Sequence, residues 1–275
     1  MLNKIRLKLY YRFLELISLS PINKEILGKT TKNCFIYYDY EREFSGHETN
    51  ITNTDIEEIL DHLDQIQLKT TWFTVGKVME KYSDTILKIT QRGHEIGSHT
   101  FAHISPKVMN RNNMETDFKN FENIRSKNKL QIEGFHSPNG QWNILMFDFL
   151  IKNNFTYDVI SLPDNRKLIR PMRFNFLKNY PIVRLVTVGD DWPLFKAQKS
   201  SLEVFEYFKG LYDKTKKGDT FGIGFHPWIL YSDKNILSGY KDFLSYVTQQ
   251  NDVILNPANE FVDKLNASFR KIKNY

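Results

Sequence analysis

The chain has 275 residues, of which 41% are hydrophobic and 25% are charged, with a formal net charge of +6. This is the composition of an ordinary globular protein that can bury a sizeable core. Its single cysteine, Cys34, excludes a disulfide framework and a zinc site built from cysteines. The basic residues are scattered and form no long tract, so we expect no nucleic-acid partner.

Residues 1–30 predict a helical segment that precedes the main domain. Five charged side chains interrupt its apolar residues: Lys4, Arg6, Lys8, Arg12 and Glu15. They exclude the apolar core of a secretory signal. No stretch of the sequence is long and apolar enough to span a bilayer. We predict an amphipathic basic helix that either packs on the domain or rests on an anionic membrane surface. We therefore expect a cytoplasmic protein, membrane-associated if the helix makes that peripheral contact.

Over residues 31–275, short apolar runs alternate with amphipathic stretches seven or eight times. The runs predict strands at 34–39, 70–75, 94–99, 132–136, 157–161, 181–188, 219–226 and 252–256. The stretches predict helices at 54–68, 77–93, 112–128, 142–154, 201–216, 236–250 and from about 257. The irregular stretch 162–180 predicts a long loop. Such alternation implies parallel strands with helices outside, so we predict an α/β fold with one domain closed as a (β/α) barrel.

Polar side chains follow five of the predicted strands. They are Asp39 with Tyr40 and Glu41, His99 with His103, His136, Asp190 with Asp191 and Trp192, and His226. In parallel barrels the carboxyl ends of the strands build the active site. We therefore expect these side chains to meet at one end of the barrel.

His99 and His103 are four positions apart, which places both imidazoles on one face of a helical turn. This spacing suits two ligands of one zinc ion, but a bare pair of this kind is more often solvated or hydrogen-bonded. An oxygen ligand from Asp39 or Glu41 would leave a position open for water. Zinc lowers the pKa of such a water, which can then attack a carbonyl. A carboxylate would take the proton, and a separate histidine would protonate the leaving group.

The five clusters, in this order, resemble the motifs of the polysaccharide deacetylase family, the NodB-homology carbohydrate esterases. HTFAH (99–103) matches the second motif fully, Asp191–Trp192 matches the fourth, and the apolar strand that ends at His226 matches the fifth. IYYDYE stands at the first motif, and HSPNG (136–140) keeps the Pro and Gly of the third. The resemblance covers residues 34 to 262. It implies a deformed NodB-like (β/α)7-8 barrel, a divalent metal, usually zinc, and hydrolysis of an N-acetyl group from a sugar.

The resemblance implies a role for each matched residue. The implied catalytic residues are Asp39 as general base, His226 as general acid and Asp191 as the group that orients His226. The implied metal ligands are His99 and His103. The expected substrate contacts are His136, Pro138, Trp192, Tyr40 and Trp228, although the two tryptophans are as often packing residues.

Two positions depart from the family pattern. Tyr40 replaces the second acid of the first motif, and because some relatives use D-x-D or D-x-E, Glu41 is the predicted third ligand. The alternative is that Glu41 is a surface carboxylate. His136 replaces an arginine that pairs with the catalytic Asp, and an imidazole is charged only part of the time near neutral pH. His136 therefore either holds Asp39 less firmly, contacts substrate or metal, or marks lost catalysis.

The predicted function is removal of an N-acetyl group from a sugar or glycan precursor in surface-polysaccharide biosynthesis. The predicted cofactor is Zn²⁺ or another divalent transition metal. A cytoplasmic address favours a nucleotide- or lipid-linked substrate, and the net positive charge suits phosphate. Two alternatives stay open. One is a catalytically silent barrel that binds a glycan or a partner, and the other is a hydrolase of a different amide, such as a formyl group.

Overall fold

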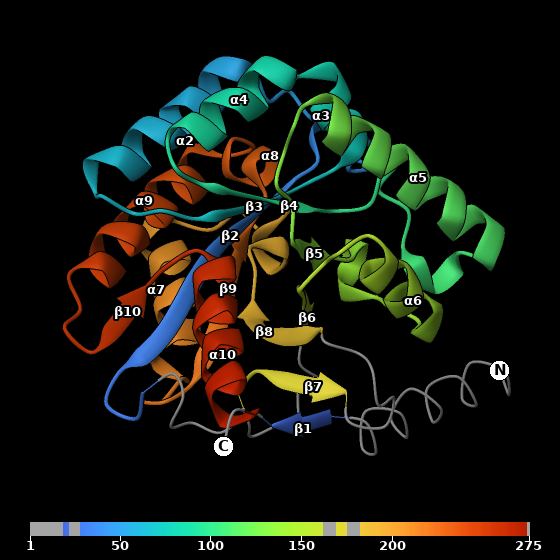
Figure 1. Ribbon diagram of the computed structural model, residues 1–275. Coiled ribbons are helices and arrows are strands. Elements are labelled where there is room, and N and C mark those ends of the chain that lie inside the picture. Colours follow the sequence, from blue (N-terminus) through green and yellow to red (C-terminus); the bar gives the residue numbers. More distant parts are fainter. Residues whose placement is uncertain (1–18, 22–27, 162–168, 175–181, 274–275) are drawn as a thin grey trace, which may run out of the picture.

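The computed structural model describes residues 19–21, 28–161, 169–174 and 182–273 of the chain (Figure 1). Most of the predicted N-terminal helix lies outside these residues, and Leu19–Pro21 within that segment form a short strand, β1. No helix in the described part of the chain combines the length and the apolar character needed to cross a lipid bilayer.

Seven parallel strands close into a ring, which confirms the predicted barrel. In order around the ring they are β2 (Lys32–Tyr40), β3 (Thr71–Thr74), β4 (Glu95–Ser98), β5 (Gly134–His136), β6 (Tyr157–Ser161), β8 (Val183–Gly189) and β9 (Thr220–Phe225). Parallel pairing of β9 with β2 closes the ring. The eighth predicted strand, β10 (Val253–Leu255), pairs with the first residues of β2 and stands outside the closed path.

The stretch predicted as a loop, 162–180, contains one more strand. β7 (Met172–Phe174) pairs antiparallel with β8, and β1 pairs antiparallel with β7. Three-residue strands carry too few side chains for a period of two to stand out in the sequence. These two strands extend the sheet beyond the ring at β8 (Figure 1).

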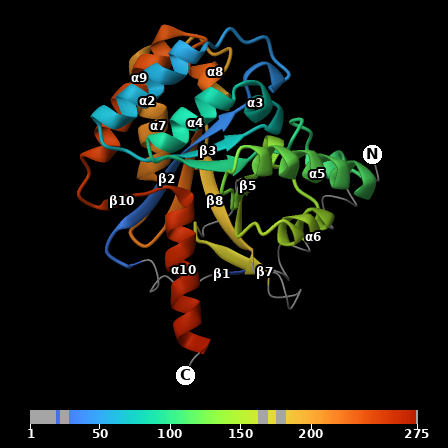
Figure 2. The same ribbon diagram turned by 45° about the horizontal axis from the view of Figure 1, so that its top comes forward.

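Helices cover the outside of the ring (Figures 1 and 2). They are α2 (Asn53–Gln65), α3 (Gly76–Lys81), α4 (Ser83–Gln91), α5 (Arg111–Lys127), α6 (Ile144–Lys152), α7 (Ser201–Asp213), α8 (Pro227–Leu230) and α9 (Lys234–Thr248). A further helix, α10 (Ala258–Lys273), lies at one end of the ring. Capping boxes begin α2 at Thr52 and α7 at Ser200. The single helix predicted at 77–93 is instead two, because Tyr82 leaves the helical conformation at φ −124° and ψ 42°.

Aromatic side chains fill the inside of the ring. Tyr37 and Tyr157 are fully buried there, and each faces a glycine on the neighbouring strand. A Cβ at Gly224 would lie 2.4 Å from the Tyr37 ring, and one at Gly134 would lie 2.1 Å from the Tyr157 hydroxyl. The glycines therefore make the room that lets two large rings fit inside a seven-stranded barrel.

Helix α10 closes the end of the barrel where the strands begin (Figure 2). Its Phe261, Val262 and Leu265 pack against the aromatic residues inside the ring. The carboxylate of Glu95, at the start of β4, accepts the Asn259 N–H of α10 at 3.1 Å. The hydroxyls of Thr71 and Tyr157 donate to the same carboxylate. Glu95 thus links the helix to the strands. It is partly buried, and the loss of hydration raises its pKa to about 7.

The raised pKa of Glu95 predicts a pH-dependent stability. Between about pH 4.5 and 7 the folded chain keeps a proton on Glu95 that the unfolded chain releases, so the contribution is complete below this window and lost as pH rises through it. Denaturant unfolding at several pH values should show wild type losing up to roughly 3 kcal/mol relative to Glu95→Gln over this range. Parallel pH profiles for the two proteins would contradict the prediction.

Candidate active site at the carboxyl ends of the strands

Four titratable side chains form the last inward-facing layer of the ring. Side chains alternate between the two faces of a strand, so Tyr37 inside the ring places Asp39 inside as well, one step nearer the carboxyl end. The same alternation continues from inward-facing glycines to His99 after β4, His136 at the end of β5 and His226 after β9. All four are buried. The predicted convergence of these strand ends is present.

Asp39 lies among three imidazoles. Its Oδ1 is 2.9 Å from His136 Nδ1, and the His99 and His226 rings are each 3.7 Å from one of its oxygens. Burial raises the pKa of this carboxyl, but the three histidines together bring the pKa below its usual range. The residue is therefore an ionised acceptor that faces the cavity.

Glu41, His99 and His103 bring three ligand atoms together. The Nε2 atoms of His103 and His99 lie 2.9 and 3.4 Å from the same Glu41 oxygen, Oε1. All three atoms lie within 4.8 Å of one another. The neighbouring histidines hold the pKa of Glu41 well below its usual value, although burial opposes this. The group is thus a carboxylate with two imidazoles, a ligand set that suits zinc and related divalent metals.

His99 shows most directly that these residues fit a metal ion. Its Nδ1 lies 2.7 Å from the carbonyl oxygen of His136, which can only accept, so Nδ1 carries the proton. Its Nε2 keeps a lone pair that is buried and has no hydrogen-bond partner. A metal-binding histidine typically donates its other N–H in this way, which fixes the ring and its tautomer.

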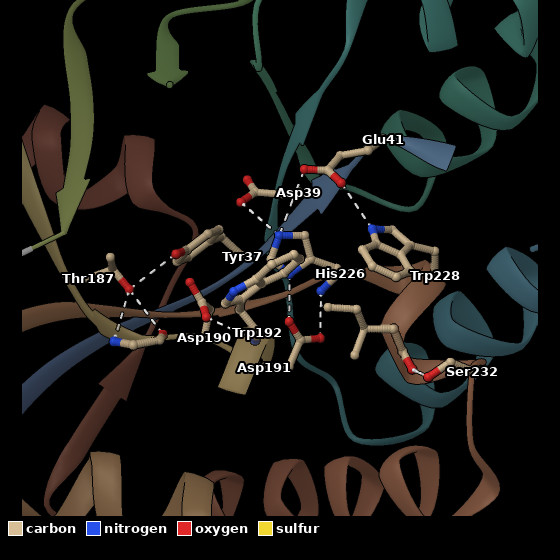
Figure 3. A network of polar contacts seen from close by, with 12 residues as sticks. Tyr37, Asp39, Glu41, Thr187, Asp190, Asp191, Trp192, His226, Trp228 and Ser232 are labelled. Carbon is tan, nitrogen blue, oxygen red and sulfur yellow. Dashed lines mark hydrogen bonds and ion pairs between the residues drawn. The ribbon is translucent and has the colours of Figure 1, made fainter. Parts of the chain in front are cut away.

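Trp228 holds the other oxygen of Glu41. Its indole N–H donates to Glu41 Oε2 at 2.9 Å (Figure 3). Because Oε2 is engaged there, Oε1 is the oxygen that faces His99 and His103. The indole thereby orients the carboxylate within the ligand group.

His226 and Asp191 form a second buried pair (Figure 3). His226 Nδ1 lies 2.5 Å from Asp191 Oδ1, and the His226 backbone N–H donates to Oδ2 at 2.8 Å. Burial lowers the pKa of His226, but Asp191, Glu41 and Asp39 raise it well above its usual value. The remaining nitrogen, Nε2, lies 3.7 Å from Asp39 Oδ2, so a protonated His226 presents a donor to the cavity.

A cavity of about 250 Å³ opens over this layer. Its lining comprises Asp39, Glu41, Ser45, His47, His103, His136, Asn139, Gly140, Ser161, Asp190, Trp192 and His226. None of these lining residues is a lysine or an arginine. Trp192 is 47% exposed, and the His47 ring lies 5.3 Å from the Trp192 ring and 5.1 Å from the Trp228 ring. The cavity is therefore polar and acidic at its base and aromatic along one side.

Three predicted substrate contacts need correction. Tyr40 is fully buried on the outer face of β2, where it meets Trp72 edge-on, because alternation turns it away from the cavity. Pro138 is buried, and the next two residues of its motif line the cavity instead. Trp228 is 4% exposed, and its indole N–H donates a hydrogen bond to Glu41. Of the predicted contacts, His136 and Trp192 do line the cavity.

Sequence reasoning assigned no role to four lining residues with polar side chains. They are Ser45, His47, Asn139 and Ser161. The only local signal for His47 was its loop, SGHETN, which follows the first motif directly. Two of the other three follow or end predicted strands, but serine and asparagine there carry no distinctive pattern.

Parts of the sequence are similar to known polysaccharide and peptidoglycan deacetylases. Residues 34–157 match the family model described as polysaccharide deacetylase. The chain is 28% identical over 157 residues to a peptidoglycan deacetylase from Helicobacter pylori, covering 57% of this chain and 47% of that protein. It is 41% identical over 46 residues, 17% of each protein, to a peptidoglycan-N-acetylglucosamine deacetylase from Bacillus cereus. The chain thus spans less than half the length of these relatives.

Solved structures share the fold. A putative polysaccharide deacetylase from Mycobacterium smegmatis superposes with a TM-score of 0.74 at 16% identity, covering 91% of this chain and 94% of that one. Puue allantoinase gives 0.72 at 16% identity, with 90% and 95% covered. A CE4 family pseudoenzyme from Bacillus anthracis, BA3943, gives 0.58 at 12% identity, with 86% and 66% covered. Residues 34–157 thus match the polysaccharide deacetylase model, and the barrel shares its fold with a solved structure described as a putative polysaccharide deacetylase.

Proposed function

We propose that this chain is a metal-dependent hydrolase that removes an N-acetyl group from a sugar or glycan precursor. One observation carries the proposal: two histidine Nε2 atoms converge on Glu41 Oε1 in the cavity that Asp39 and His226 also line. The peptidoglycan deacetylases among the relatives support the reaction class. Glu41, His99 and His103 would hold the metal. When bound, Zn²⁺ or another divalent transition metal would polarise the substrate carbonyl and acidify water.

Asp39 is the proposed general base. Its Oδ1 is engaged by His136 at 2.9 Å, and Oδ2 lies on the side of His226, 3.7 Å from Nε2. Its lowered pKa keeps the carboxylate ionised and able to take a proton from an attacking water. His136 thus occupies the place in which the family uses arginine, and it holds the base with one hydrogen bond where an arginine fork would offer two.

His226 is the proposed general acid. Asp191 accepts from its Nδ1 and raises its pKa, so the ring keeps a proton on Nε2 near neutral pH. That proton would pass to the nitrogen of the sugar as the C–N bond breaks, which makes the amine a better leaving group. Asp191 is fully buried and does not line the cavity, so its part is to orient and charge His226.

The lining favours a neutral reacting group. Asp39, Glu41 and Asp190 are acidic, and the cavity lining includes histidines but no lysine or arginine. The lining therefore offers a phosphate no permanently charged side chain, so we place a nucleotide or lipid link, if the substrate has one, outside the cavity. Trp192 offers a partly exposed ring at the side, a surface suited to the apolar face of a sugar. The cytoplasmic address and a role in surface-polysaccharide biosynthesis are part of this proposal.

Two other functions are retained as competitors. A silent barrel that binds a glycan or a partner is suggested by the replacements at Tyr40 and His136 and by the pseudoenzyme among the structural neighbours. Glu41 argues against it, because this residue supplies the carboxylate that Tyr40 lacks. Hydrolysis of a different amide, such as a formyl group, would use the same residues in the same roles.

Metal content separates the hydrolase from the silent barrel. Purified wild type, incubated with zinc and dialysed, should hold about one ion per chain by elemental analysis. His99→Ala/His103→Ala should hold essentially none, because two of three ligands are gone. His62→Ala is the control, since His62 lies on α2 outside the cavity, and it should bind like wild type. If the wild-type chain bound no metal, the hydrolase proposal would be wrong.

Asp39→Asn tests the general base. The substitution preserves shape but removes the proton acceptor, so the turnover number on N-acetylated sugars should fall about 10²- to 10⁴-fold while metal content stays unchanged. The product should be acetate. Release of formate from a formylated substrate, with N-acetyl sugars untouched, would favour the competing amide hydrolase. Equal turnover by wild type and Asp39→Asn would remove Asp39 from the mechanism.

Trp228→Phe tests how Glu41 is oriented. Loss of the indole N–H frees Glu41 Oε2, so zinc affinity measured by competition with a chromophoric chelator should fall by about 10- to 100-fold. Trp142→Phe provides a matched control, because Trp142 is also buried but lies outside the cavity. An unchanged affinity in Trp228→Phe would mean that Glu41 needs no such support or is not a ligand.

A further inference from the structure

The turn between His99 and His103 has an unusual backbone. Thr100 and His103 have φ angles of 62° and 57°, in the left-handed region that residues with a Cβ rarely adopt. Such conformations persist only where surrounding contacts over-determine them. The direction of both imidazoles depends on this turn, so the contacts that hold it bear directly on the ligand group.

One side of the turn is held by β3 and α3. The His99 N–H donates to the Thr74 carbonyl at 3.1 Å, and the Gly76 N–H donates to the Thr100 carbonyl at 2.9 Å. A Cβ at Gly76 would lie 2.6 Å from the Phe101 ring, so the turn can approach α3 this closely only at a glycine. These bonds engage the His99 N–H and the Thr100 carbonyl but leave the N–H groups of Phe101 and Ala102 to other partners.

Asp117 on α5 takes those two N–H groups. Phe101 N–H donates to one carboxylate oxygen at 2.9 Å, and Ala102 N–H donates to the other at 3.2 Å. The side chain is 7% exposed and belongs to the buried face of α5 with Met114 and Phe118. Helices α3 and α5 lie side by side next to the turn (Figures 1 and 2). A buried carboxylate on an apolar helix face costs free energy unless it accepts hydrogen bonds. Two successive backbone N–H groups can donate such bonds to an anion.

We propose that Asp117 is a positioning residue for the metal-ligand group. Its carboxylate spans two successive N–H groups in the middle of the HTFAH turn and holds the left-handed conformations of Thr100 and His103. That conformation directs the Nε2 atoms of His99 and His103 to the same oxygen of Glu41. Asp117 touches neither imidazole and lies outside the cavity, so it acts through the backbone alone. The proposal rests on the proposed metal-dependent function.

The test compares Asp117→Ala with Met114→Ala. Met114 lies one turn earlier on the same buried face, so its truncation destabilises α5 but leaves both hydrogen bonds of Asp117 to the turn in place. At a temperature where circular dichroism shows both variants folded, zinc affinity should fall about 10- to 100-fold in Asp117→Ala and stay within about twofold in Met114→Ala. The visible spectrum of the cobalt-loaded protein, which reports ligand geometry, should change only in Asp117→Ala.

A second readout needs no metal. Amide hydrogen exchange at Phe101 and Ala102 in the metal-free protein should be at least about tenfold faster in Asp117→Ala than in Met114→Ala. Asp117→Asn keeps one acceptor oxygen, so it should lie between wild type and alanine, and it replaces the alanine variant if that fails to fold. Unchanged exchange, or zinc affinity equal to that of Met114→Ala, would overturn the proposal. A wild-type chain that binds no metal would defeat the proposed function, and exchange alone would then decide on Asp117.

Discussion

The pairing of β9 with β2 is the constraint on which the site depends. These strands lie far apart in sequence, and their pairing both closes the ring and sets His226 of one beside Asp39 of the other. Once the ring is closed, strand alternation decides which side chains can reach the cavity. Glycine at the inward positions of β9 leaves room for the β2 aromatics, so the packing that closes the ring also positions its chemistry.

The first motif keeps two carboxylates in the cavity although Tyr40 replaces one of its acids. Alternation along β2 turns Asp39 inward and Tyr40 outward, and Glu41, the first residue after the strand, also lines the cavity. A D-x-E pattern therefore delivers two carboxylates to one cavity. The longer glutamate reaches past the strand end to His103, and Trp228 engages its second oxygen. The replacement by Tyr40 adds to the core and leaves a carboxylate among the histidines.

The site is charged but well compensated. Each carboxylate that burial would neutralise has histidines or N–H donors beside it, and these contacts determine which oxygen faces the cavity. The supporting groups come from different elements: Asp191 after β8, Trp228 on α8 and Asp117 on α5. Asp191 and Trp228 hydrogen-bond directly to His226 and Glu41, whereas Asp117 accepts from two backbone N–H groups of the HTFAH turn. The precision of the site thus comes from residues around it as much as from those within it.

The sequence by itself determined the alternation of strands and helices, the barrel class and the residues at five strand ends, because periodicity and composition are local properties. The resemblance to the family also predicted Glu41 as a third metal ligand, and the structure places its carboxylate beside His99 and His103. The tertiary structure decided the rest. Seven strands rather than eight close the ring, Tyr82 divides one predicted helix, and Tyr40 and Trp228 turn out to be buried. His47 at the cavity and Asp117 behind the HTFAH turn had no motif to mark them. Their roles come from contacts between residues distant in sequence, which only the closed and packed chain brings together.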